Sequence, residues 1–159
     1  GREAAMELIL WRHAEAEVGE PDLGRKLTGK GEKQARRMAE WLHAHLPQSA
    51  RILVSPATRA QQTAHALARL GHRKLKTVEA IAPGASAAEV LAAADWPNAR
   101  HTTVIVGHQP TLGWVVAELL AGSVHGWAVK KGAVWWLQSR ARGDDPQVVL
   151  RAVTNPDLL

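Results

Sequence analysis

The sequence predicts an α/β fold, a three-layer sandwich with a mainly parallel central sheet and helices on both faces. Apolar runs rich in Val, Ile and Leu alternate along the chain with segments of helical periodicity, which is the pattern of successive strand–helix units. The clearest runs are continuously apolar, as in strands that are buried on both faces. The chain has 159 residues, of which 46% are apolar and 22% charged, and this composition suits one folded domain.

The first strand–helix unit lies near the N-terminus. The segment "ELILW" at 7–11 predicts a buried strand. A helix then begins at Thr28 or Gly29 and is closed by Pro47. Its apolar residues share one face, because they recur at i, i+3, i+4, i+7 and i+11. These residues are Ala35, Met38, Ala39, Leu42 and Leu46.

The second unit begins with the strand "RILVS" at 51–55. Ser55 followed by Pro56 is typical of a helix start, with a side-chain cap and then a proline in the first turn. This helix ends at Gly71. The residues predicted to face the core are Ala60, Thr63, Ala64, Leu67 and Ala68.

The alternation continues in the second half of the chain. "KTVEAI" at 76–81 predicts a short strand, and 83–95 predicts a loop with a short Ala-rich helix. "TTVIVG" at 102–107 is the clearest strand, because it is continuous and β-branched. A helix over 110–122 follows, with a proline at its start and a glycine past its end.

The chain closes with a predicted antiparallel hairpin. Its strands are "GAVWWLQ" at 132–138 and "QVVLRAV" at 147–153, joined by the loop "SRARGDDP". Residues 6–159 are expected to form a single domain. Residues 1–5 precede Met6 and are expected to be a cloning remnant or a disordered N-terminus.

Composition excludes several classes of site. The absence of cysteine removes disulfides, thiolate catalysis and Cys-based zinc sites. No apolar stretch reaches the length of about 18 residues that a membrane span needs, and no signal-peptide pattern is present, so a cytoplasmic enzyme with no membrane partner is expected.

The net charge of +5 raises the question of an anionic partner. The aromatic residues are all tryptophan and do not interleave with the basic residues, as single-stranded nucleic-acid binding would require. We therefore expect no nucleic-acid partner and interpret most of the basic residues as a solvated surface. Among them are Arg36, Arg37, Arg73, Lys74, Lys76, Lys130 and Lys131.

Polar side chains follow three of the predicted strands at the point where each strand ends. Arg12 and His13 follow the first strand, Arg59 lies in the first turn after the second, and His108 follows the strand at 102–107. Ligands of parallel sheets bind outside the carboxyl ends of the strands. The sequence therefore predicts that two guanidinium groups and two imidazoles share one pocket.

This set of groups predicts a site for a small dianion, most plausibly phosphate. Arginine matches phosphate oxygens with two parallel hydrogen bonds, and the starts of the two following helices add N–H groups and partial positive charge. A neutral imidazole held by a carbonyl can also attack phosphorus. Clustered carboxylates and cysteines are absent, so we expect neither a metal nor another cofactor.

Four segments in order resemble the signatures of the histidine phosphatase (phosphoglycerate mutase-like) superfamily. They are "LILWRHAEA", "RKLTGKGEKQA", "VSPATRAQQTA" and "VIVGHQPTL". Their order and spacing are similar to its short branch, the phosphohistidine phosphatases of the SixA type, over nearly the whole chain from Met6. The ordered set carries the resemblance, since each segment alone is common.

The resemblance implies a role for each matching residue. His13 would be the nucleophile that accepts the phosphoryl group, while Arg12, Arg59 and His108 would bind phosphate. Arg25 matches a substrate-facing arginine of this branch. The larger relatives carry an inserted cap region that this chain has no room for, so an open pocket without a cap is expected.

The sequence departs from the family pattern at two points. Ala14 stands where many relatives have glycine after the Arg-His pair, a small steric change. The glutamate that serves larger relatives as general acid has no assured match. Glu79 is the main candidate for this substrate-contacting role, and Glu15 and Glu17 are weaker ones.

The missing acid bears on the substrate. An imidazole leaves from phosphohistidine as a base of pKa about 6.5 and needs far less protonation than an alkoxide. We therefore expect phosphohistidine on a signalling protein, such as a histidine phosphotransfer domain, to be the substrate. Two alternatives stay open: a phosphatase of small phosphate esters, and a phospho-ligand binding module without catalysis.

Overall fold

The computed structural model describes residues 5–123, 125–142 and 145–159. Of the N-terminal stretch predicted to be a remnant, residues 1–4 lie outside this described part. The strands are β1 (Glu7–Arg12), β2 (Arg51–Val54), β3 (Leu75–Thr77), β4 (Thr103–Gly107), β5 (Val134–Arg142) and β6 (Asp145–Thr154). They form one six-stranded sheet in the order β3-β2-β4-β1-β5-β6. The pairs β3–β2, β2–β4 and β4–β1 are parallel, whereas β1–β5 and β5–β6 are antiparallel.

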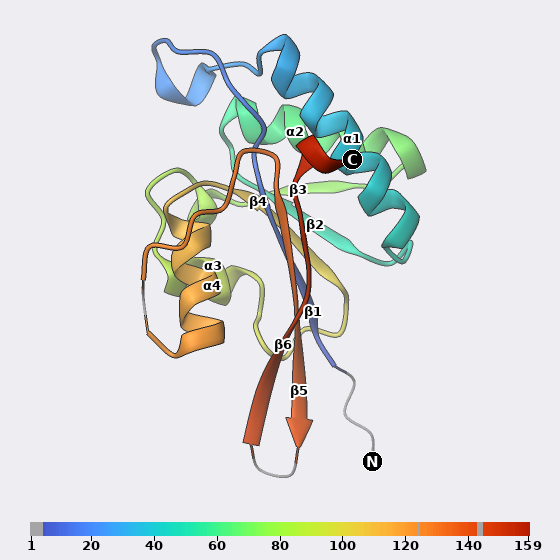
Figure 1. The fold of residues 1–159 in the computed structure, drawn as a ribbon. Helices are drawn as coiled ribbons and strands as arrows, with labels where there is room; N and C mark the ends of the chain where they lie inside the picture. Colours follow the sequence, from blue (N-terminus) through green and yellow to red (C-terminus); the bar gives the residue numbers. More distant parts are fainter. Residues whose placement is uncertain (1–4, 124, 143–144) are drawn as a thin grey trace.

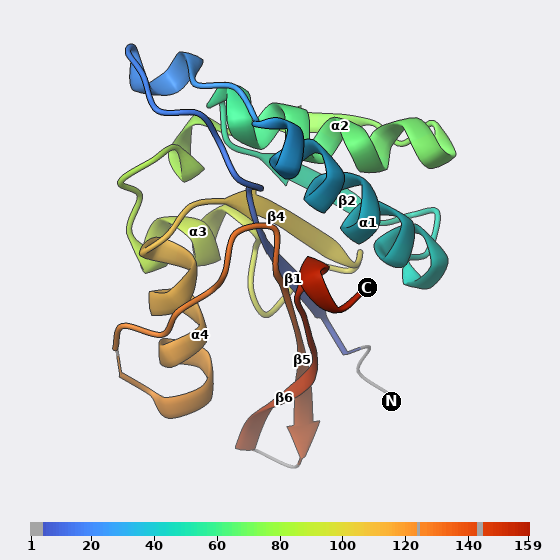
Figure 2. The same cartoon turned by 45° about the horizontal axis from the view of Figure 1, so that its top comes forward.

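Helices cover both faces of this sheet. The α-helices are α1 (Gly29–His45), α2 (Thr58–Gly71), α3 (Ala87–Ala93) and α4 (Thr111–Ala121), and the short 3₁₀ turns are η1 (Asp22–Gly24), η2 (Glu79–Ile81) and η3 (Pro156–Leu158). Helices α1 and α2 lie together on one face, and α3 and α4 lie on the other (Figures 1 and 2). The predicted α/β sandwich with a mainly parallel sheet is therefore confirmed. None of the helices in the described residues has the length and apolarity that a membrane crossing requires.

The alternation of side chains along β1 explains why its sequence is apolar at every position. Ile9 and Trp11 are buried in the cluster beneath α1 and α2, whereas Leu8 and Leu10 are buried in the cluster beneath α3 and α4. Successive residues of a strand point to opposite faces, so a strand covered on both sides has no solvent-facing position.

The start and end of α1 follow the prediction. Thr28 is the N-cap, and its hydroxyl accepts a hydrogen bond from the Gly31 N–H at 2.9 Å. At the other end, the guanidinium of Arg73 donates to the carbonyls of Leu46 and Pro47 at 3.3 and 2.8 Å. Arg73 is buried, so it is a structural residue and not part of a solvated basic surface.

The predicted cap of α2 is wrong. The helix begins at Thr58, and its N-cap is Ala57, which has no side-chain cap. The Ser55 hydroxyl instead accepts from the Ala57 N–H at 3.1 Å and bonds to the ring of His108 at 2.7 Å. The Ser55 hydroxyl, which the sequence predicted to cap α2, thus forms a tertiary hydrogen bond to His108 instead.

Two of the later elements differ from the prediction in extent. The strand predicted at 76–81 stops at Thr77, because Glu79–Ile81 turn into η2 with Ile81 buried. The hairpin is confirmed, but its strands are longer than predicted and pair along most of 139–146. Residues 143–144 of the predicted connection lie outside the described part of the chain.

Candidate active site

Three strand ends bring the predicted polar residues to one edge of the sheet. Arg12 of β1 pairs in register with Gly107 at the end of β4, and β4 also pairs with β2. His13 directly follows β1 and His108 directly follows β4, and their ring centroids lie 5.1 Å apart. Arg59 enters the same site from the first turn of α2, and this residue is 4% exposed. The structure thus brings together the four residues predicted to share a phosphate site.

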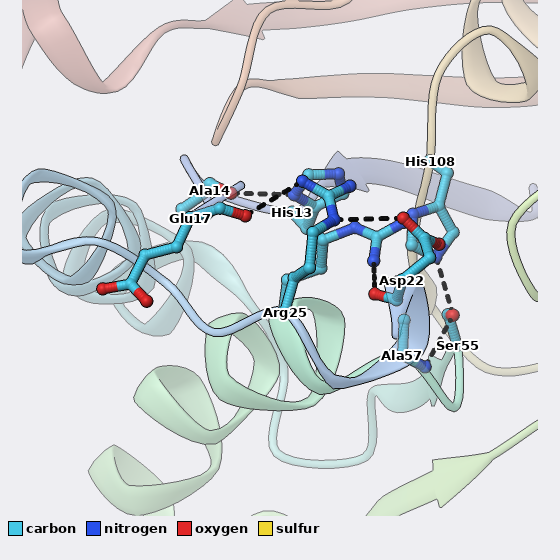
Figure 3. A network of polar contacts seen from close by, with 9 residues as sticks. His13, Ala14, Glu17, Asp22, Arg25, Ser55, Ala57 and His108 are labelled. Atoms are coloured by element: carbon cyan, nitrogen blue, oxygen red, sulfur yellow. Dashed lines mark hydrogen bonds and ion pairs between the residues drawn. The ribbon is translucent and has the colours of Figure 1, made fainter. Parts of the chain in front are cut away.

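The ring of His13 is held in one tautomer. Its Nδ1–H donates to the carbonyl of Ala14 at 2.7 Å, which leaves Nε2 as a lone-pair donor (Figure 3). Its main-chain N–H donates to Gly107 at 3.0 Å, and its carbonyl accepts from Gly132 at 3.1 Å. The imidazole is therefore oriented with one nitrogen free to act as a nucleophile.

The segment after His13 is clamped between two helices. Ala14 donates its N–H to the Thr63 hydroxyl of α2 at 3.0 Å, and Glu15 donates to the side chain of Gln34 on α1, also at 3.0 Å. A Cβ on Gly31 would overlap the carbonyl oxygen of Glu15, so only glycine allows α1 to approach this closely. Ala14 is fully buried in this packing. Both helices therefore fix the carbonyl that orients His13.

The surroundings of His13 favour its neutral form. Burial lowers the pKa of His13 to about 4, and the positive charges of Arg59, Arg12 and Arg25 act in the same direction. The hydrogen bond to Ala14 acts the other way but is outweighed. At neutral pH the ring is therefore an uncharged imidazole, the form that can attack phosphorus.

His108 is neutral for related reasons. Burial lowers the pKa of His108 to about 3, helped by the nearby His13, Arg59 and Arg12 and opposed by Asp22. The Ser55 hydroxyl bonds to its Nε2, while its Nδ1 is buried and has no hydrogen-bond partner in the described part of the chain. A ring that accepts from Ser55 at Nε2 carries its proton on Nδ1, where it is available to an anion.

The two arginines also keep buried donors free. Arg12 donates from Nη1 to the carbonyl of Val129 at 2.9 Å, and Arg59 donates from Nη1 to the carbonyl of Asp22 at 2.9 Å. The Nε–H of each guanidinium is buried without a partner among the described residues. Burial, together with the charge of Arg59, lowers the pKa of Arg12. Buried unpaired donors are rare in folded proteins, so their concentration at this edge indicates a site for an anion.

Asp22 is a residue of this site that the sequence argument missed. Its carboxylate accepts from Arg59 Nη2 at 3.2 Å. It also accepts from Arg25 Nε at 3.0 Å, as Figure 3 shows. Desolvation acts to raise the pKa of Asp22, but the charges and hydrogen bonds of the two guanidiniums lower it overall. Arg25 also donates to the carbonyl of Glu17 at 3.1 Å. Only the spacing of Asp22 and Arg25 in sequence could have suggested this bridge, and such spacing in a loop is a weak indication.

The three glutamates considered as proton donors lie differently. Glu79 is the exposed first residue of η2, and no hydrogen bond or ion pair among the described residues joins it to either site histidine. The carboxylate of Glu15 accepts from the Thr28 hydroxyl at 2.8 Å. The side chain of Glu17 is exposed, and its main chain provides the contact to Arg25. The role of Glu79 stays a prediction.

The lowered histidine pKa values predict a distinctive titration. In the ligand-free protein, His13 and His108 should stay neutral down to about pH 5, well below the ordinary histidine value near 6.5. Imidazole NMR of isotope-labelled protein measures this directly. A site histidine that gains its proton between pH 6 and 7 would contradict the described electrostatics.

The same shifts predict how stability changes with pH. Between about pH 6.5 and 4, these two histidines are protonated in the unfolded chain but remain neutral in the folded protein. Stability should therefore rise with pH across this window and level off above it, by about 1.4 kcal/mol per pH unit for each histidine. Chemical unfolding of wild type and His108→Asn measures this contribution, and equal slopes for the two proteins would contradict it.

Comparison with known proteins finds that this chain is similar to phosphatases. Residues 8–82 match the model of the histidine phosphatase superfamily, branch 1. The phosphohistidine phosphatase SixA homolog of Haemophilus influenzae is 36% identical over 126 residues, which cover 72% of this chain and 77% of that protein. Phosphohistidine phosphatase SixA of Escherichia coli is 30% identical over 127 residues, which cover 74% of this chain and 76% of that protein.

A solved structure extends the similarity to nearly the whole chain. A SixA-type protein from Nakamurella multipartitia superposes with a TM-score of 0.78 at 28% identity, covering 97% of this chain and 98% of that one. The match includes the late hairpin, which lies beyond the residues matched by the superfamily model.

Proposed function

Because the chain belongs to the SixA-type branch of the histidine phosphatase superfamily, and is therefore a phosphatase, we propose that it dephosphorylates phosphohistidine on a protein through a phosphohistidine intermediate at His13. The observation that carries this proposal is a neutral imidazole with one fixed tautomer, surrounded by buried donors that lack partners. Such a site supplies a nucleophile and the stabilisation of an oxyanion together.

In the first step, His13 Nε2 attacks the phosphorus of the substrate. A bond from Nε2 to phosphorus forms as the bond from phosphorus to the substrate imidazole breaks. When the substrate ring carries a proton on its other nitrogen, it leaves as a neutral imidazole, and the enzyme need not supply a proton. The His13 ring then carries the positive charge, with its Nδ1–H still donated to Ala14.

In the second step, water attacks phosphorus and the bond to His13 breaks. The proton lost by water goes to the phosphate product or to solvent, and His13 returns to its neutral form. During both steps the negative charge lies mainly on the equatorial oxygens of the phosphoryl group. Arg12, Arg59 and His108 each offer a buried N–H for these oxygens.

The substrate class follows from the leaving group. A sugar or serine phosphate expels an alkoxide, which needs a proton from a well-placed acid. Glu79 is exposed and forms no hydrogen bond or ion pair with the site histidines among the described residues. The neutral imidazole that leaves from phosphohistidine needs no such acid. This difference favours phosphohistidine over the alternative of a small phosphate ester.

Phosphate release from matched substrates tests this proposal. With chelator present, kcat/KM for a phosphohistidine-bearing protein should exceed that for a phosphoserine peptide by at least about 10²-fold, the usual contribution of a general acid. An aryl phosphate, whose leaving group is also weakly basic, should be hydrolysed as well. Equal rates for phosphohistidine and phosphoserine would contradict the proposed substrate, and activity that chelator abolishes would contradict the metal-independent mechanism.

A further inference from the structure

A basic pocket of about 430 Å³ lies directly beside the phosphate-binding residues, with Arg12 in its wall. Lys30, from the first turn of α1, lines it together with Lys130 and Lys131 from the segment that leads into β5. The mechanism proposed above uses none of these three lysines. The pocket is thus a distinct surface that shares one arginine with the phosphate site.

The segment that contains Lys130 and Lys131 is hydrogen-bonded to the main chain of Arg12 and His13. The N–H of Gly132 donates to the carbonyls of both Arg12 and His13 at 3.1 Å, and Ala133 donates to the Lys130 carbonyl at 2.9 Å. Gly132 has a φ of +73°, and a Cβ there would lie 3.2 Å from a ring carbon of Pro156. These contacts fix the main chain of the lysines relative to His13.

The charges of the pocket are not balanced by its own carboxylates. Its two carboxylates, Glu15 and Asp157, are outnumbered by the four cationic side chains that line it. In the described part of the chain, no carboxylate forms an ion pair with Lys30, Lys130 or Lys131. All three lysines are exposed, so their ammonium groups are free to meet a charged partner.

We propose that this pocket binds acidic side chains that flank the phosphorylated residue of the protein substrate. The inference rests on the proposed function, since it concerns what the phosphoryl group is attached to. Arg12 lines this pocket together with the lysines, so a carrier whose phosphoryl group is bound by Arg12 has its neighbouring part within reach of them. Three exposed lysines from two separate segments suit the spread charge of an acidic protein surface, and such complementarity raises association rate and specificity.

Charge reversal with matched peptides tests this inference. The probes are three phosphohistidine peptides that differ only in flanking glutamate, glutamine or lysine, and an aryl phosphate too small to reach the pocket. Peptide rates are divided by the aryl phosphate rate, which corrects for any change at the phosphate site itself. Wild type should prefer the glutamate peptide over the lysine peptide by about tenfold in kcat/KM, mainly through KM.

The variant Lys130→Glu with Lys131→Glu should lose or invert this preference. The matched control is Lys74→Glu with Lys76→Glu, which changes the net charge equally just before and within strand β3, at the far edge of the sheet. It should keep the preference of the wild type. The wild-type preference should also shrink as salt is added, because exposed charges are screened.

Three results would overturn the inference. Equal turnover of the three peptides by wild type would contradict the role of the pocket but leave the proposed function intact. The same would follow if the control variant lost the preference as much as the Lys130→Glu, Lys131→Glu variant does. Hydrolysis of the aryl phosphate without turnover of any peptide would instead contradict the proposed phosphohistidine substrate, and the inference with it.

Discussion

Replacing His13 by alanine is expected to abolish phosphate release, with kcat/KM lowered by at least about 10³-fold. The reason is that the variant has no nitrogen at the position from which Nε2 attacks. His108 does not substitute for it, because its Nε2 is bonded to Ser55 at 2.7 Å. Steady-state phosphate release from an aryl phosphate and from a phosphohistidine protein measures the loss.

The control for this variant is His65→Ala, which removes an exposed histidine from α2. This control should retain full activity. Thermal unfolding shows whether His13→Ala still folds, which is expected because the folded protein buries His13 at an electrostatic cost. A folded His13→Ala protein that keeps a tenth or more of the wild-type activity would contradict the assigned nucleophile.

Replacing Arg59 by methionine is expected to cause the second-largest loss, about 10²- to 10³-fold in kcat/KM. Its buried Nε–H has no partner in the described part of the chain and is available to an equatorial oxygen. Arg59→Lys should restore little of the activity, since an ammonium keeps the charge but lacks the planar set of donors. Arg69→Met, on the exposed side of the same helix, is the matched control.

Stability should respond to Arg59→Met in the opposite sense to activity. Arg59 is 4% exposed and lies near Arg12. Its carboxylate partner among the described residues, Asp22, lies on an exposed turn. Removing a poorly compensated buried charge is often neutral or stabilising. A thermal midpoint equal to or above that of wild type supports this view. A large drop in the midpoint would show that Arg59 stabilises the fold. The loss of activity would then not be evidence that Arg59 binds the phosphoryl group.

Much of the fold could be predicted because the local patterns agree with the tertiary structure. The continuous apolar runs of β1 and β4 reflect burial on both faces, which their side chains confirm. Parallel pairing then places the strand ends together. The meeting of His13, Arg59 and His108 therefore followed from topology, without any knowledge of loop conformations.

The predictions that failed concern side chains whose partners are distant in sequence. The Ser55 hydroxyl had a plausible local role as a helix cap, but His108 competes for it from 53 residues away. Arg73 looked like a surface charge, yet it caps the end of α1 across 26 residues. Neither partner leaves a periodic pattern in the sequence that could reveal it.

The conformation of the loop before α1 also lay beyond sequence reasoning. Asp22 reaches Arg59 over 37 residues, and only the folded position of η1 makes this contact possible. The strand predicted over 76–81 was wrong at its end, where Glu79 lies, for a different reason. A short run of mixed residues does not distinguish a strand from a turn by periodicity, and a buried Ile81 holds η2 in place.

The central claim is that the phosphoryl group passes through His13. The most direct measurement is a rapid quench in denaturing alkali during turnover of an aryl phosphate, followed by mass spectrometry of the peptides. We expect an acid-labile, alkali-stable phosphoryl group on the peptide that contains His13, and no such group in His13→Ala. A phosphoryl group found on His108, or turnover at full rate with no adduct on any histidine, would contradict the claim.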